Sequence, residues 1–455
     1  MRNIMERALR KSKAEYTEIR IESVVSSWVN FRGQELDSIG SSKILGGIVR
    51  ALFKGGWGYA TFNDLGDLDL RVVEAFESAR LVGRGESELA EVVPVVDEIE
   101  ASLEKDFRQI PLSAKEGVIE EYNTIILEYD NKVETSNVGY RDSFRKIWYV
   151  NSEGAYIEDE RPDVGVVMSA MAREGANIQQ GFESVAGGAG FQIVEGLQEK
   201  AETAAKRAVE LLTAPPVTGG KYPVVINPKL AGVFAHEAFG HLSESDFVYE
   251  NERIKDLMVL GRQVASEKVS IIDDGTIPGL RGTHRYDDEG VKTRKNYLIK
   301  DGILVGRLHS RETARKMGEE PTGNARAISY QHQPIIRMTN TYIDKGSASF
   351  EDMTRDVKLG LYAVDMVGGQ TSMEMFTFSA AYGYMIRDGK LAECVRDVVL
   401  TGNVFETLMH IDMVGDTVEY PPAGGGCGKD GQSPLPVGFG GPYVRIQDVV
   451  VGGRS

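Results

Sequence analysis

Two histidines and a glutamate lie within the run 234–241, Phe-Ala-His-Glu-Ala-Phe-Gly-His. His236 directly precedes Glu237, and three residues separate Glu237 from His241. Imidazole nitrogens bind zinc, and a neighbouring carboxylate can accept a proton from a water on the metal. These residue types therefore indicate a metal-dependent hydrolase. The common zinc-hydrolase motif has two intervening residues instead of three, so the spacing of this run is unusual.

The spacing of the two histidines places a demand on the backbone. On a regular α-helix His236 and His241 point about 140° apart, so they cannot easily bind the same ion. If both are ligands, the helix must end or widen between them. Gly240 lies where it can allow this, either as a glycine directly after the helix end or beside a π-bulge. A regular helix through residue 241 would contradict a shared metal site.

The helical pattern also places Glu237 on a face that we expect to be buried. That face carries His241 and several apolar side chains, namely Leu230, Val233, Phe234 and Ala238. A buried carboxylate is costly unless a charge or a hydrogen bond compensates it. A metal, or a water bound to one, would provide that compensation.

A catalytic zinc needs a third protein ligand and an open position. Carboxylates are plentiful, and the remaining histidines are His284, His309, His332 and His410. Cys427 is the sharper candidate, because the glycines around it in the run 421–432 allow close backbone approach and positive φ. Lys429 and a metal would both favour its thiolate. The other cysteine, Cys394, follows a strand pattern and is interpreted as a packing residue.

Simpler interpretations of these residues stay open at this point. The run 234–241 can be a helix end with a core histidine and a surface glutamate, and Cys427 alone can be a loop thiol. The run 284–290 is interpreted as a solvated turn in preference to a cluster that supports the site. Residues 323–327 are interpreted as a loop.

The composition is that of a globular protein without a nucleic-acid partner. The 455 residues are 42% hydrophobic and 26% charged, which allows two or three domains with cores of their own. The formal net charge of -16 argues against direct contact with nucleic acid, because proteins that bind it usually carry basic patches. No stretch is long and apolar enough to span a membrane, and the first residues lack a secretory signal. Two cysteines and no export signal favour a reducing, cytoplasmic setting.

Changes in residue pattern divide the chain into segments, and the whole is expected to be an α+β protein with antiparallel strands. The segments are an N-terminal α/β domain at 1–87, a linker at 88–112, a middle α/β segment at 113–215 and a β-rich C-terminal catalytic domain at 216–455. The first segment shows half-buried strands, a hairpin turn at 54–56 and a helix over about 67–83. The linker is acidic, contains proline and is weakly periodic.

Local signals predict several later elements. Ser113 and Glu116 match a capping box at a helix start. A long helix over roughly 190–213 should end before the two prolines at 215 and 216. Asn227 before Pro228 predicts the start of the helix that carries the His-Glu run, because asparagine caps free amides and proline has no amide to satisfy. Asp301 and Gly302 predict a hairpin turn.

Five blocks of the sequence together resemble the TldD/PmbA family of metalloproteases. They are the His-Glu run with Glu244 and Asp246, residues 287–290, residues 323–326, residues 337–340, and residues 426–432. Their order and spacing match along the whole chain, most densely from residue 216 onward. The complete His-Glu-three-His motif is similar to that of the TldD-type catalytic subunit, whereas TldE/PmbA-type subunits lack it.

The resemblance implies roles for particular residues. It implies Zn²⁺ held by His236, His241 and Cys427, with Glu237 as the general base on a zinc-bound water. It also implies an N-terminal α/β domain, a middle segment and a β-rich C-terminal domain that carries the zinc-site helix. Family members cut unfolded peptides that are held extended within a dimer, so main-chain hydrogen bonds to a strand edge are expected to hold the substrate.

The expected function is zinc-dependent hydrolysis of unfolded or extended peptides, and other functions remain open. The particle can be a homodimer or a heterodimer with a TldE/PmbA-type subunit. One rival is a non-catalytic peptide-binding or assembly partner with a structural zinc. Another is a zinc hydrolase for a small amide or ester. An association of this family with DNA gyrase would suggest a regulator linked to nucleic acid, but the net charge argues against direct DNA contact.

Overall fold

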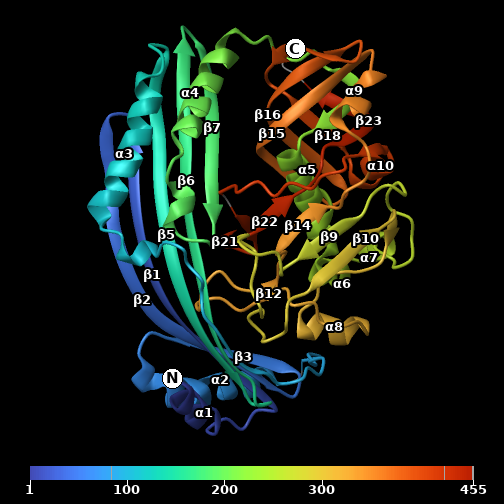
Figure 1. Cartoon of the computed structure of the whole chain (residues 1–455). Coiled ribbons are helices and arrows are strands. Elements are labelled where there is room, and N and C mark those ends of the chain that lie inside the picture. Colours follow the sequence, from blue (N-terminus) through green and yellow to red (C-terminus); the bar gives the residue numbers. More distant parts are fainter. Residues whose placement is uncertain (84, 425, 453–455) are drawn as a thin grey trace.

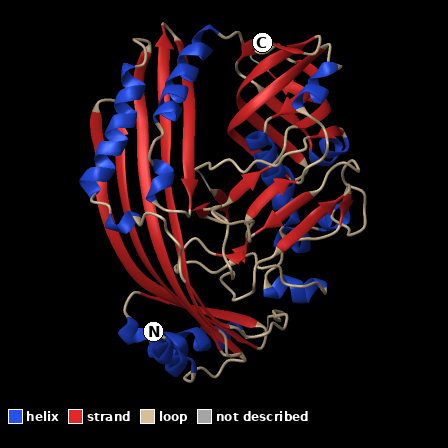
Figure 2. Cartoon of the chain, viewed as in Figure 1, coloured by secondary structure: helices blue, strands red, loops and turns tan. Residues whose placement is uncertain are grey.

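The computed structural model describes residues 1–83, 85–424 and 426–452. A long curved sheet and its helices, up to α4 (Gln198–Thr213), lie beside a C-terminal part made of shorter strands and helices (Figure 1). Helices and strands are mixed along the chain, and strands dominate the C-terminal part (Figure 2). The predicted α+β class is confirmed. None of the helices in the described ranges combines the length and apolar character of a membrane-spanning segment.

In the described residues, the N-terminal sheet has seven strands. They are β1 (Tyr16–Arg32), β2 (Glu35–Phe53), β3 (Gly56–Phe62), β4 (Val96–Ile99), β5 (Val133–Asn151), β6 (Tyr156–Glu174) and β7 (Asn177–Gly187). Their order is β3-β2-β1-β5-β6-β4, and β7 also pairs with β6. Strands from the predicted segments 1–87 and 113–215 thus share one sheet, and β4 joins it from the predicted linker. The division into domains stays a prediction.

Helices cover the N-terminal sheet at two places (Figure 1). α3 (Leu112–Glu128) and α4 pack on one face, where Tyr122, Ile126 and Ala205 are buried against side chains of β5 and β6. α1 (Arg2–Leu9) and α2 (Leu68–Val82) pack at the end of the sheet that holds β3. α2 confirms the helix predicted over 67–83, and Lys54 and Gly55 confirm the predicted turn with φ of 49° and 74°.

Two local predictions in this part need correction. α3 begins directly after Pro111 with no side-chain cap, so Ser113 lies inside the first turn and forms no capping box. Pro111 occupies the N-cap position with an extended backbone (φ -56°, ψ 144°). The helix predicted over 190–213 ends as expected but starts later, at Gln198. Gly196 interrupts it with a φ of +69°, which a helix cannot contain.

The C-terminal part contains a sheet whose pairings form a closed circuit. Its strands are β8 (Gly220–Ile226), β15 (Leu359–Ser372), β16 (Met375–Arg387), β17 (Lys390–Val395), β18 (Val399–Asn403), β19 (Ile411–Val414) and β23 (Val444–Gly452). The circuit runs β15-β8-β23-β18-β16 and returns to β15 through the β15–β16 hairpin. Phe234 packs edge-on against Phe376 and Phe378 of β16, which anchors the helix before the His-Glu run to this sheet.

Smaller sheets and short helices complete the C-terminal part. One sheet has the order β11-β10-β9-β14-β22, and two strand pairs, β12–β13 and β20–β21, lie beside it. The strands are β9 (Ile271–Asp274), β10 (Lys295–Lys300), β11 (Ile303–Leu304), β12 (Ala325–Arg326), β13 (Ile335–Ile336), β14 (Asn340–Ile343), β20 (Cys427–Lys429), β21 (Gln432–Leu435) and β22 (Gly438–Gly440). The helices are α5 (Pro228–Phe234), α6 (Ser245–Glu250), α7 (Glu252–Leu257), α8 (Arg311–Met317), α9 (Phe350–Arg355) and α10 (Val404–Met409). Asp301 and Gly302 form the predicted turn between β10 and β11.

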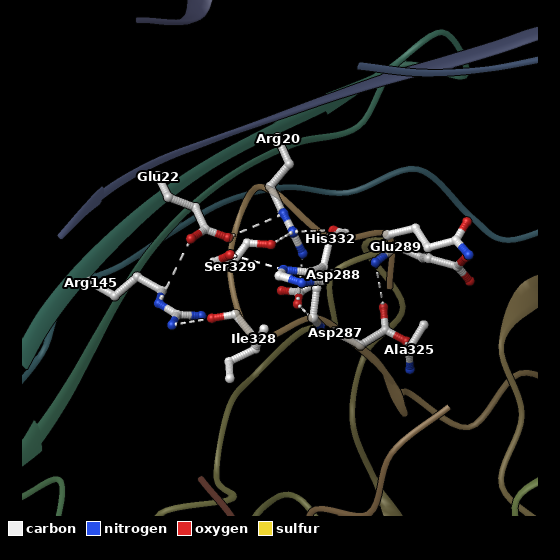
Figure 3. Close-up of polar contacts among 12 residues, drawn as sticks. Arg20, Glu22, Arg145, Asp287, Asp288, Glu289, Ala325, Ile328, Ser329 and His332 are labelled. Carbon is white, nitrogen blue, oxygen red and sulfur yellow. Dashed lines mark hydrogen bonds and ion pairs between the residues drawn. The ribbon is translucent and has the colours of Figure 1, made fainter. Parts of the chain in front are cut away.

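A buried network of charges joins the N-terminal sheet to the C-terminal part (Figure 3). Arg20 of β1 lies 2.8 Å from a carboxylate oxygen of Asp288 and also donates to the carbonyl oxygens of Ser329 and His332. Arg50 of β2 lies 3.0 Å from Glu289. These contacts hold the loop that follows β12 against the sheet.

The interpretation of residues 284–290 as a solvated turn is wrong. Asp287, Asp288 and Glu289 are buried. Burial raises the pKa of Asp288, but Arg20 and Arg161 outweigh burial and lower it well below its usual range. Arg161 reaches Asp288 from 127 residues away in the chain, so no local pattern could have predicted the pairing. The loop interpretation of 323–327 holds for Gly323, Asn324 and Ala327, whereas Ala325 and Arg326 form the short strand β12.

Candidate metal centre

The segment that carries both histidines widens as it passes between them. Asn227 caps α5, and its side-chain oxygen accepts a hydrogen bond from the amide of Leu230 at 3.0 Å. The helix then becomes a π-helix over Ala235–Gly240 and a 3₁₀ turn over His241–Ser243. The predicted helix start and the predicted widening are both confirmed. The wider turn brings the rings of His236 and His241 to a centroid separation of 5.2 Å.

Gly240 takes part in this widening without ending the helix. Its φ of -54° is right-handed, so it does not act as a left-handed cap. A Cβ atom at this position would lie 2.0 Å from the sulfur of Met338. Glycine is needed here because the π-helix packs directly against a buried methionine side chain.

Cys427 completes a group of three potential metal ligands. Donor atoms of His236, His241 and Cys427 all lie within 4.8 Å of one another. The sulfur of Cys427 is 3.4 Å from Nε2 of His241. Sulfur at about 2.3 Å and nitrogen at about 2.0 Å from a tetrahedral zinc are roughly 3.5 Å apart, so this distance fits the metal. Nδ1 of His236 is buried without a hydrogen-bond partner in the described residues.

The electrostatics of the three side chains favour a cation between them. Burial raises the pKa of the Cys427 thiol, but His236 and His241 outweigh it and the pKa falls to about 4. Burial lowers the pKa of His241, but Glu244 and Cys427 raise it well above its ordinary value. The same negative groups that hold a proton on His241 would attract a metal ion.

Arg337 holds the hairpin that carries Cys427. Its guanidinium is fully buried and donates to the carbonyl oxygens of Cys427 at 2.7 Å and Gln432 at 3.0 Å. The Arg337 guanidinium thus forms hydrogen bonds to both strands of the hairpin, β20 and β21. The partners lie 90 and 95 residues from Arg337 in the sequence, so their pairing carries no local signal. Gly425, in the predicted glycine-rich run, lies outside the described residues.

Lys429, which was expected to favour the Cys427 thiolate, forms ion pairs with two carboxylates. Its ammonium lies 2.7 Å from Asp246 and 3.1 Å from Glu244, and the same oxygen of Glu244 lies 3.1 Å from Nδ1 of His241. The groups that lower the pKa of Cys427 are the histidines. Glu244 therefore contacts His241 at Nδ1, whereas the other ring nitrogen, Nε2, faces the Cys427 sulfur. The spacing of these residues in the sequence did not predict this contact.

Glu237 lies beside the three donors at the wall of a cavity of about 480 Å³. One of its oxygens is 3.9 Å from Nε2 of His241, and about a quarter of its side chain is exposed (27%). The face predicted to be buried is buried at Leu230, Val233, Phe234 and Ala238. Glu237 is thus partly exposed and lines a cavity that also borders His241.

The other histidines lie elsewhere. Within the described ranges, His236, His241 and Cys427 are the one group of three or more metal-binding side chains that converge. His309 pairs with Glu319, and His284 is buried in the contact between the two parts of the molecule. Cys394 lies on β17, as its pattern predicted.

Sequence comparison places the whole chain in one family. Residues 17–81 match domain 1 of the PmbA/TldA metallopeptidases, residues 105–212 match their central domain, and residues 219–453 match their C-terminal domain. The chain belongs to the PmbA/TldD family. The resemblance found from the five sequence blocks is confirmed.

Relatives within the PmbA/TldD family are named as metalloproteases. A metalloprotease of Synechocystis is 44% identical over 446 residues, which cover 98% of this chain and 96% of the relative. A metalloprotease TldD homologue of Haemophilus influenzae is 36% identical over 72% of this chain and 69% of its own. A zinc metalloprotease TldD homologue of Saccharolobus solfataricus is 30% identical over 70% of this chain and 72% of its own.

A solved structure of the PmbA/TldD family shares the fold. TldE from Thermococcus kodakarensis superposes with a TM-score of 0.79 at 18% identity, over 100% of both chains. At this identity the likeness concerns the fold alone.

Proposed function

We propose that this chain is a zinc-dependent peptidase of the TldD type that hydrolyses unfolded or extended peptides. His236, His241 and Cys427 hold the metal, and Glu237 is the general base. The observation that carries the proposal is the convergence of three zinc-type donors within 4.8 Å, beside a carboxylate on a cavity wall. Three protein ligands with one position left open are typical of catalytic zinc.

The metal and the residues around the cavity have separate roles in the proposed reaction. Bound zinc supplies a Lewis acid that polarises a carbonyl group and lowers the pKa of a coordinated water. Glu237 accepts the proton of the attacking water and can return it to the leaving amine. The three side chains keep their positions because residues of α5, of the π-helix and of the hairpin of β20 and β21 are packed in the core.

One wall of the cavity that Glu237 lines suits an extended peptide. Gly369, Gln370 and Thr371 of β15 line the same cavity. In the described part of the chain, the second half of β15 pairs with β16 and leaves its other edge without a partner strand. An unpaired strand edge can bind a peptide through main-chain hydrogen bonds. Such bonds depend little on the side chains of the peptide. The substrate class therefore is unfolded peptide, with weak sequence selectivity.

The working particle is proposed to be a dimer in the cytoplasm. A second copy of this chain or a TldE/PmbA-type subunit would be the partner, and the fold shared with TldE of Thermococcus kodakarensis supports the second arrangement. Mass measurement of the purified chain, alone and mixed with such a subunit, separates the two.

Peptidase activity and metal content of the purified chain test the proposal together. We expect about one zinc per chain and cleavage of unfolded casein that a chelator removes and added zinc restores. Glu237→Gln should keep the zinc and abolish cleavage. Glu252→Gln is the matched control, because the Glu252 side chain is 88% exposed on α7. Retained cleavage in Glu237→Gln would exclude this base, and zinc binding without any cleavage would favour a structural metal in a peptide-binding partner.

A further inference from the structure

A buried carboxylate links one candidate metal ligand to the segment that carries another. Glu244 is fully buried. Its Oε2 atom lies 3.1 Å from Nδ1 of His241 and 3.1 Å from the ammonium of Lys429. A single oxygen thus contacts both an imidazole and a cation.

Lys429 connects this carboxylate to the cysteine hairpin. It lies two residues after Cys427 on β20 and is itself buried. Its ammonium also contacts Asp246 at 2.7 Å and donates to the carbonyl oxygen of Ile336 at 3.1 Å. The lysine therefore ties the backbone after His241 to the backbone after Cys427, although the two segments are far apart in the sequence.

We propose that Glu244 and Lys429 are a positioning pair for the metal centre: Glu244 orients the ring of His241, and Lys429 sets the separation of His241 from Cys427. This inference rests on the proposed zinc site. With Nδ1–H donating to Glu244, the lone pair of His241 lies on Nε2, the atom 3.4 Å from the Cys427 sulfur. A carboxylate on the far nitrogen of a metal-binding histidine both fixes the ring and strengthens its donor atom.

The charges of the pair support a role beyond packing. Glu244 and Asp246 bring two carboxylates to the one ammonium of Lys429. The cluster therefore keeps an excess negative charge, and Glu244 places part of it against His241. Burying such an excess is costly unless a further positive charge lies close by. A metal ion held by His241 would supply that charge.

Zinc affinity, measured by competition with a chromogenic chelator, tests the pair. Glu244→Gln preserves the shape and an acceptor oxygen but removes the charge, whereas Glu244→Ala removes both. We expect Glu244→Gln to weaken zinc binding about 10-fold and Glu244→Ala about 100-fold. Lys429→Met should also weaken binding, because Glu244 loses its anchor. Glu252→Gln is the matched control, because it makes the same change at a carboxylate whose side chain is 88% exposed on α7.

The outcomes separate this inference from the proposed function. If the unaltered chain binds no zinc, the proposed function fails and the inference falls with it. If the unaltered chain binds zinc and Glu244→Gln binds it within twofold as tightly, the inference alone is overturned. Thermal unfolding of the metal-free variants shows whether folding is affected. Should Glu244→Gln fail to fold, ¹⁵N NMR of the zinc-loaded unaltered chain decides: a proton on Nδ1 of His241 supports the pair, and a proton on Nε2 overturns it.

Discussion

The amide of His241 donates a hydrogen bond to the carbonyl oxygen of His236, five residues earlier. This is the bond of a π-helix, and it closes a wider turn than the four-residue bond of an α-helix. The wider turn places the two imidazoles on the same side of the segment. The extra residue in the motif, which seems to separate the histidines on a regular helix, is therefore accommodated by a change in helix type.

Gly240→Ala tests how tightly this turn is packed. The added methyl group would lie 2.0 Å from the sulfur of Met338, which is fully buried and has little room to move. We expect a loss of about 1–3 kcal/mol in the free energy of unfolding, the usual effect of overpacking, measured by urea denaturation. In a double-mutant cycle, Gly240→Ala should cost less in a Met338→Ala background than in the unaltered chain, because the clashing side chain is gone. An unchanged cost of Gly240→Ala in that background would show that Met338 is not the obstacle.

Cys427→Ala and Cys394→Ala make a matched pair, since they replace the two cysteines of the chain. Cys427 lies among the histidines, whereas Cys394 lies on β17 in the closed sheet. We expect the first change to remove most of the bound zinc, because the thiolate is one of three proposed ligands. The second change should leave zinc content unaltered. Metal analysis of the purified variants checks this, and full zinc content in Cys427→Ala would remove the thiol from the ligand set.

Asp288→Asn probes the charge network between the two parts of the molecule. Asp288 pairs with Arg20 at 2.8 Å and Arg161 at 3.0 Å, and Asp288 and Arg20 are buried whereas Arg161 is partly exposed. Removing one partner of a buried ion pair leaves an uncompensated charge and should lower the free energy of unfolding by about 3–5 kcal/mol. Arg387→Met, which breaks an exposed ion pair with Glu393, should have little effect. Similar small effects of both changes would contradict a stabilising role for the network.

His284 should make the stability of this protein depend on pH. Burial lowers the pKa of His284 well below its ordinary value, nearby Arg326 and Arg161 lower it further, and Asp288 opposes them. Below about pH 6.5 the unfolded chain takes up a proton that the folded chain refuses, so stability is present above this pH and falls below it. The slope is about 1.4 kcal/mol per pH unit for one such group. In His284→Gln, urea unfolding between pH 7.5 and 5.5 should lose this slope; parallel curves for the variant and the unaltered chain would exclude the effect.

Some features of the fold follow from residues that are close in the sequence. Asn227 and Pro228 start a helix because one caps the amides and the other lacks one, and Asp301 with Gly302 turns a hairpin because both tolerate positive φ. Ser113 shows the limit of such signals. It has the right neighbours for a cap, yet the helix starts at Leu112 and Ser113 lies inside the first turn.

The sequence by itself determined which residue types could bind a metal, and that the helix between His236 and His241 had to end or widen if both are ligands. Those conclusions depend on side-chain chemistry and on the geometry of one short segment. Only the tertiary structure decided that Lys429 meets Glu244, that Arg337 grips the Cys427 hairpin and that the acidic run 284–290 is buried. In each case a charged side chain finds its partner through long-range packing. The energy of that pairing depends on burial, which sequence spacing does not encode.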